Sequence, residues 1–78
     1  LRIINEYNEL KTSLEVEEPN QISMQLMTLN GKVVYFNSAS LIKGINYLEP
    51  IEVGQYAKGI YIISYHIDDH IISRKIML

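Results

Sequence analysis

Residues 56–67, which read YAKGIYIISYHI, form the most strand-like stretch of the sequence. From residue 61 onward the residues of one face alternate with those of the other, Tyr61, Ile63, Tyr65 and Ile67 against Ile62, Ser64 and His66. A period of two is typical of a strand, so the stretch predicts a strand with one strongly apolar face. Because Ile60 and Ile62 are also apolar, we expect the start of this strand to be covered on both sides. Gly59 precedes it, where a positive φ carries little steric penalty.

The glycine and tyrosine at the start of this strand resemble a tyrosine corner. In that motif of immunoglobulin-like sandwiches, the hydroxyl of a strand tyrosine bonds to backbone a few residues upstream. Gly59 and Tyr61 are therefore expected to be structural residues at a corner of the fold. Ile63 stands where antibody domains have a disulfide cysteine, and the chain contains no cysteine. The sequence therefore predicts a purely apolar core.

Outward from this strand, the rest of the chain reads as short strands separated by polar turns. We expect strands over residues 10–16, 21–29, 32–36 and 71–78, one or two short strands over 45–53, and a strand or the tail of a linker over 1–4. Turns or polar connectors are expected over residues 5–9, 17–20, 37–44 and 54–55. The alternation in residues 21–29 breaks near Met27 and Thr28, which predicts a β-bulge. Pro50 has no N–H and places its segment at a sheet edge or at a break.

Two tight turns are predicted to join neighbouring strands into hairpins. Asn30 and Gly31 lie between two apolar runs, and an Asn-Gly pair favours a type I′ turn because both central residues need a positive φ. Asp68 and Asp69 close a second hairpin into the last strand. The sequence leaves two inward faces open for that last strand, Ile72 with Ile76 or Ile71 with Met77.

Together these elements predict an all-β fold, a small immunoglobulin-like antiparallel β-sandwich of about seven short strands. The length of 78 residues indicates a single domain over 1–78, in which residues 1–9 are a linker or the first strand. An amphipathic helix is the alternative for residues 3–14, because Ile3, Tyr7, Leu10 and Leu14 have helical spacing.

Composition argues against several classes of function. The formal net charge is -2, and we expect no nucleic-acid partner because phosphate binding rests on clustered lysine and arginine. No apolar run reaches the roughly 18 residues of a membrane-spanning helix, so no transmembrane segment is expected. Without cysteine there is no disulfide framework and no thiolate metal site. The sequence opens with Leu1 and not with methionine, so we expect a piece of a longer protein or a processed product.

One hairpin carries the only cluster of metal-ligand residue types, in which His66 and His70 flank Asp68 and Asp69. A zinc site needs three or four converging donors, whereas Asp is common at hairpin tips because it tolerates the turn backbone. A plain turn is therefore the favoured interpretation. No nucleophile elbow and no phosphate-binding glycine loop is present. We predict no catalytic residue, no cofactor and no metal, and we do not expect an enzyme.

The six tyrosines offer an alternative function. Three of them are predicted to pack in the core, namely Tyr35, Tyr61 and Tyr65. Three others are less constrained, namely Tyr7, Tyr47 and Tyr56. Exposure of that second trio on one face would indicate an accessory immunoglobulin-like module that binds carbohydrate or protein for an attached enzyme. Burial of all three would exclude this alternative.

Four short motifs follow one another in a characteristic order. They are Asn30-Gly31-Lys32, Gly44-Ile45-Asn46, residues 56–63 with Gly59-Ile60-Tyr61, and the final residues 74–78. In order and spacing they resemble the C-terminal sorting domain of the type IX (Por) secretion system of Bacteroidetes. The resemblance covers roughly residues 5–78. The chain differs from the family pattern in lacking a Pro-Asn-Pro near residues 5–10 and a last lysine.

The resemblance implies a non-catalytic signal domain that directs an attached N-terminal cargo protein through the type IX secretion system to the cell surface. Its implied partners are the outer-membrane secretion translocon and sortase-type machinery. Its implied location is the periplasm in transit, then the cell surface or the extracellular space. An exposed strand edge offers unpaired N–H and C=O groups, so we expect recognition at the last strand and the hairpin edges. The residues expected to make these contacts are Lys32, Arg74, Lys75, Ile76, Met77 and Leu78. The residues expected to be structural are Asn30, Gly31, Gly59 and Tyr61.

Overall fold

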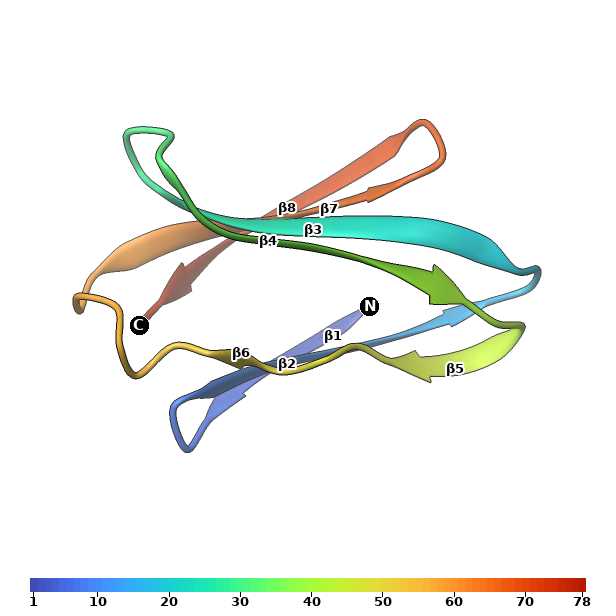
Figure 1. Ribbon diagram of the computed structural model, residues 1–78, viewed down its shortest axis with the longest axis horizontal. Coiled ribbons are helices and arrows are strands. Elements are labelled where there is room, and N and C mark those ends of the chain that lie inside the picture. Colours follow the sequence, from blue (N-terminus) through green and yellow to red (C-terminus); the bar gives the residue numbers. More distant parts are fainter.

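The computed structural model describes residues 1–78 and contains only β-strands and their connections (Figure 1). Two antiparallel sheets lie one above the other as the layers of a sandwich. The strands are β1 (Arg2–Glu6), β2 (Glu9–Val16), β3 (Asn20–Thr28), β4 (Val33–Leu41), β5 (Gly44–Tyr47), β6 (Ile51–Glu52), β7 (Ile60–Ile67) and β8 (His70–Met77). The predicted all-β sandwich is confirmed, with eight strands where about seven were expected.

The strand that dominates the sequence, β7, lies inside a sheet and pairs on both sides. Its sheet has the order β4-β3-β7-β8, so β4 and β8 are the two edges. The other sheet has the order β1-β2-β5, and the short β6 also pairs with β2. Pro50 falls between β5 and β6, where it was expected to break the segment. An interior position explains why β7 has the clearest strand pattern of the chain.

The core lies between the two sheets and is formed by alternate residues of the strands. Tyr61, Ile63 and Tyr65 of β7 are buried, as the period of two predicts. The buried apolar residues are Leu10, Leu14, Ile22, Met24, Leu26, Leu41, Leu48, Ile51, Val53, Tyr61, Ile63 and Tyr65. One polar contact interrupts this core, because the hydroxyls of Thr12 and Tyr65 meet across the two sheets at 2.5 Å. The core is therefore apolar apart from one buried hydrogen bond.

The predicted tyrosine corner is present at the start of β7. Gly59 has a φ of 152°, and Tyr61 Oη donates to the carbonyl of Ala57 at 2.8 Å. The Leu78 N–H also donates to the Gly59 carbonyl at 2.8 Å, so the corner fixes the end of the chain as well. The prediction that the start of this strand is buried on both faces is wrong for Ile60, which is 44% exposed. Its side chain lies on the outer face of the sheet, where no second layer packs.

The alternative helix over residues 3–14 is wrong. β1 and β2 form an antiparallel hairpin there, with registers from Arg2 opposite Ser13 to Glu6 opposite Glu9. The turn is shorter than the expected 5–9 and consists of Tyr7 and Asn8, which have φ values of 51° and 61°. The side-chain period of two in β2 prevails because every second residue, from Leu10 to Val16, faces the opposite sheet.

The polar loop expected over residues 37–44 is also wrong, because β4 continues to Leu41. Ser38 and Ser40 are exposed, while Ala39 packs against the core and Leu41 is buried. Polar residues therefore occupy the solvent face of an edge strand. Only residues 42 and 43 connect β4 to β5.

The hairpin predicted at Asn30 and Gly31 is confirmed, but its turn is not of type I′. Gly31 has a φ of 90°, whereas the φ of Asn30 is not positive. The Gly31 N–H donates to the Thr28 carbonyl at 3.0 Å. This pattern is typical of a three-residue loop in which a type I turn precedes a left-handed glycine. Leu26 pairs with Tyr35 and Met27 with Val33, so the extra residue of the bulge is Val34 in β4. The bulge predicted within β3 is therefore wrong, and β3 pairs with β7 in an unbroken register.

Candidate functional site at the edge of the last strand

β8 lies at one edge of its sheet, where β7 is its only partner. Residues in an antiparallel pair alternate between positions that exchange both hydrogen bonds with the partner and positions whose N–H and C=O face away. Gly59 and Leu78 exchange both of their backbone hydrogen bonds, which identifies the bonded positions of the pair. The residues whose backbone faces the free edge are therefore Ile71, Ser73, Lys75 and Met77.

Side chains cap two of the carbonyls on this edge. Asn5 Nδ2, from β1 in the other sheet, donates to the Met77 carbonyl at 3.1 Å. Arg74 Nη1 donates to the carbonyl of its neighbour Ser73 at 3.0 Å. The outward N–H groups of β8 have no strand beside them. The edge is thus closed at its Met77 end and open before it.

The side chains of β8 divide between the core and the outer face of the sheet. Ile76 and Leu78 are half-buried against the core, as is Ile72, which settles the inward face that the sequence left open. Met77 is 65% exposed on the outer face, and Arg74 and Lys75 are exposed as well. Of the five expected contact residues 74–78, three are therefore accessible as side chains, and two hold this end of the chain on the core.

A groove lies between β8 and β1, the edge strand of the other sheet. It has a volume of about 390 Å³ and is lined by Leu1, Ile3, Asn5, Leu10, Arg74, Lys75, Ile76 and Met77. Five of these eight residues are hydrophobic. The two cations form no ion pair, since both ion pairs of the chain are made by Lys11. The groove combines apolar walls with positive charge that no acidic side chain neutralises.

Lys32, the remaining expected contact residue, lies in the turn between β3 and β4. Its neighbour Val33 belongs to a row that crosses the sheet through Met27 and Ile62 to Lys75. Three strand spacings separate the ends of this row, which amounts to about 14 Å. The structure therefore brings residues 74–78 together and places Lys32 at the opposite edge.

Three residues of the site were not identified from the sequence. Ile71 and Ser73 present outward backbone groups, which could have been found from the two-residue turn between β7 and β8, because that turn fixes the alternation. Asn5 caps Met77 across a separation of 72 residues. No local pattern identifies a contact that depends on how the two sheets stack.

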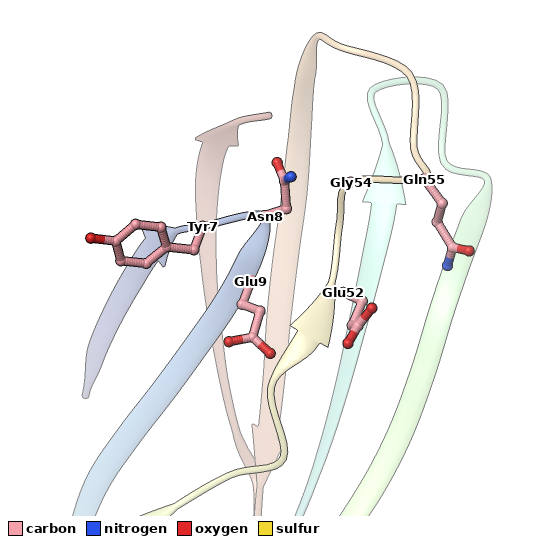
Figure 2. A pocket seen from close by; sticks show the side chains of 6 residues that line it. All are labelled: Tyr7, Asn8, Glu9, Glu52, Gly54 and Gln55. Atoms are coloured by element: carbon pink, nitrogen blue, oxygen red, sulfur yellow. The ribbon is translucent and has the colours of Figure 1, made fainter.

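A second hollow, shown in Figure 2, lies between the β1–β2 turn and the segment after β6. It has a volume of about 480 Å³ and is lined by Tyr7, Asn8, Glu9, Glu52, Gly54 and Gln55. Glu9 and Glu52 are opposite each other in register, and the Tyr7 ring points away from the other lining side chains. No group of three His, Asp or Glu side chains is placed to hold a metal ion. The hollow brings two carboxylates together without a nucleophile or a third ligand.

The residues weighed for other functions do not converge. His66 and His70 lie on adjacent strands at positions of opposite parity, so their side chains point to opposite faces of the hairpin. Tyr7 and Tyr47 are 89% and 82% exposed, but Tyr56 is half-buried and donates to a β4 carbonyl at 3.2 Å. The exposed trio of tyrosines on one face is not formed.

The fold and the site define a class of protein, a small β-sandwich with an edge strand open to pairing. Over residues 8–78 the chain matches the family described as Secretion system C-terminal sorting domain, and it belongs to that family. Domains of this family indicate a C-terminal sorting signal for type IX secretion, and the family implies Bacteroidetes. Comparisons with curated proteins and with solved structures gave no significant match. The structure contains no helix that is long and apolar enough to cross a bilayer.

Proposed function

We propose that this domain is a non-catalytic sorting signal that directs an attached N-terminal cargo protein through the type IX secretion system to the cell surface. Residues 1–78 act as one unit in this proposal, and the outer-membrane translocon and sortase-type machinery recognise it. The domain passes through the periplasm and ends at the cell surface or outside the cell. The observation that carries the proposal is the family match over residues 8–78.

The geometry of β8 supports recognition at this strand. Ile76 and Leu78 pack against the core, so the strand is held in an extended form with its outer edge accessible. Arg74, Lys75 and Met77 are exposed along it and are our proposed contacts. Lys32 joins them only if the partner also covers the outer face of the sheet.

The exposed surface of the domain also supports binding to another protein. The chain exposes 5369 Å². A compact protein of 9.0 kDa is expected to expose about 4,850 Å² by the scaling of area with mass. The excess is consistent with a flat sandwich that leaves its edges and the outer face of each sheet uncovered.

The test is a reporter protein with a signal peptide, fused to the N-terminal end of residues 1–78 and expressed in a bacterium that has a type IX system. We expect the reporter at the cell surface, measured by protease accessibility on intact cells and by fractionation. The same fusion without residues 71–78 is expected to stay in the periplasm. If both fusions remain periplasmic, or both reach the surface, the proposed function is refuted.

Because the deletion removes most of β8, a pair of point variants separates recognition from folding. Lys75→Glu changes an exposed cation on the proposed contact strand, and Lys43→Glu makes the same charge change in the β4–β5 connection. We expect Lys75→Glu to reduce the surface fraction of the reporter and Lys43→Glu to leave it unchanged. Equal effects of the two variants would argue against recognition at β8.

A further inference from the structure

We propose that the free edge of β8 takes up an extended acidic segment of a partner protein as an added β-strand, seated along the groove between β8 and β1. This inference rests on the proposed function and deepens it, because it states the chemistry of the segment that recognises the domain. The added strand extends the order β4-β3-β7-β8 by one position. Addition of a strand to a free edge supplies affinity through main-chain hydrogen bonds and specificity through alternate side chains.

The backbone of β8 sets the length of the added strand. Outward N–H and C=O groups occur at Ile71, Ser73 and Lys75, which repeat about every 6.8 Å along the strand. Among these groups the Ser73 carbonyl accepts a hydrogen bond from Arg74 Nη1 of the same strand, which an added strand replaces. The next outward carbonyl, that of Met77, is bonded to Asn5 Nδ2 from the other sheet. An added strand therefore pairs over about five residues and ends where β1 closes the edge.

The charges of β8 determine that the added segment should be negatively charged. Arg74 and Lys75 form no ion pair. All seven glutamates of the chain lie in the other sheet or in connections outside β7 and β8. Asp68 and Asp69 are at the turn of the hairpin, at the far end from the last residue, and Asp68 accepts a hydrogen bond from Asn20 at 2.8 Å (Figure 1). An acidic residue opposite each cation forms a favourable cross-strand pair, and a basic residue there is repelled.

The residues that line the groove determine which other side chains of the added segment fit. Side chains that point inward from the added strand meet Ile76 of β8 and Ile3 and Leu10 of the other sheet. Apolar β-branched residues fit this position because they favour extended backbone and pack on a sheet. The segment is therefore two adjacent acidic residues flanked by residues such as valine and threonine.

A second copy of the chain is the competing occupant of this edge. When two β8 strands pair antiparallel with the longest overlap, Arg74 lies opposite or diagonal to Arg74 of the second copy. Like charges at such positions destabilise the pair. The charge pattern of β8 therefore favours a different, acidic chain.

The test uses two dye-labelled synthetic peptides with blocked ends, VEETVT and the matched VKKTVT, and fluorescence anisotropy with the 78-residue chain. Read antiparallel to β8, the two acids of VEETVT lie opposite Lys75 and Arg74, and its valines lie opposite Ile76 and Ile72. We expect VEETVT to bind at least about threefold more tightly than VKKTVT at low salt, from two exposed cross-strand charge pairs. The preference is expected to shrink as salt is added.

Two sets of variants separate the backbone from the charges. Ser73→Pro removes an outward N–H and leaves the hydrogen bonds between β8 and β7 intact, because Ser73 occupies a position that does not bond to β7. Ser73→Ala is its matched control, since both changes remove the contact of Ser73 Oγ with Ser64 Oγ at 2.9 Å. The double variant Arg74→Glu/Lys75→Glu is expected to prefer VKKTVT over VEETVT.

The proposal is supported if Ser73→Pro loses binding of VEETVT and Ser73→Ala keeps it. It also requires that the double variant reverses the preference between the two peptides. Equal binding of the two peptides, or equal binding by Ser73→Pro and Ser73→Ala, overturns it. So does a dimer in analytical ultracentrifugation that Ser73→Pro abolishes, because the edge is then occupied by a second copy. A domain that binds VEETVT as expected but does not direct export refutes the proposed function and not the chemistry of the edge.

Discussion

The hydrogen bond between Thr12 and Tyr65 gives a prediction about what joins the two sheets. Tyr65 is fully buried and Thr12 is 4% exposed, and their hydroxyls lie 2.5 Å apart. No buried side-chain nitrogen or oxygen of the chain lacks a hydrogen-bond partner. Removing either hydroxyl therefore leaves the other as a buried polar group without a hydrogen-bond partner.

The expected magnitudes follow from this pairing. Tyr65→Phe leaves the Thr12 hydroxyl buried without a partner and is expected to reduce the free energy of unfolding by about 1–3 kcal/mol. Thr12→Val leaves the Tyr65 hydroxyl in the same state and has a similar expected effect. The double variant replaces the Thr12 hydroxyl by a methyl group and removes the Tyr65 hydroxyl, so no buried polar group is left unpaired and the change is expected to be nearly neutral. Because the double variant loses almost nothing, the coupling equals the sum of the two single losses, about 2–6 kcal/mol.

Urea unfolding followed by circular dichroism measures these values in the wild type, the two single variants and the double variant. The slope of the free energy against urea should be the same in all four, so that only stability changes. Each kcal/mol is also expected to move the melting temperature by about 4–8 °C in a domain of this size. If the double variant loses the sum of the two single losses, the hydroxyls do not depend on each other and the reasoning fails.

The same residue makes stability depend on pH at the alkaline end. Burial raises the pKa of Tyr65 above its ordinary value of 10.0, while the hydrogen bond with Thr12 and the charge of Arg74 lower it. Because the neutral hydroxyl is favoured in the folded state, its contribution is fully present below the unfolded pKa and is lost as pH rises through the higher folded pKa. The wild type is expected to lose stability more steeply than Tyr65→Phe above about pH 10. Parallel losses in the two proteins would contradict this account.

Three further changes have expected outcomes in the same unfolding measurement. Tyr61→Phe removes the bond to the Ala57 carbonyl and is expected to cost about 0.5–1.5 kcal/mol; no loss would mean that the corner does not stabilise the fold. Gly31→Ala places a Cβ at a φ of 90° and is expected to cost about 1–2 kcal/mol through backbone strain alone, because open space surrounds that position. Arg74→Pro removes a hydrogen bond to β7 and is expected to cost about 1–3 kcal/mol, whereas Lys75→Pro removes only an outward N–H and should cost much less. Equal losses in the two proline variants would show that the alternation along β8 is assigned wrongly.

The sequence predicts features that depend on a local pattern of residues. It does not predict contacts that depend on how strands pair and how the two sheets stack. The bond of Tyr61 to Ala57 spans four residues, and its geometry follows from one motif. The turn at Asn30 was placed correctly but assigned the wrong type, because the extra residue Val34 in β4 shifts the register so that three residues close the hairpin. The Asn5 cap on Met77 depends on the stacking of two sheets, which no local spacing encodes.

The contrast between the two edges of the sheet β4-β3-β7-β8 explains why recognition is proposed at only one of them. The β4 edge is tied to the chain that passes it, because Tyr56 Oη donates to the Val34 carbonyl at 3.2 Å and Asn37 Nδ2 donates to Glu49 at 3.5 Å. At the β8 edge the only bond from another strand is that of Asn5, at the extreme end. Proteins commonly cover edge strands or shorten them, since a free edge invites pairing with other chains. The open part of the β8 edge, from Ile71 to Lys75, is therefore better explained as a surface for a partner than as an unprotected end of the fold.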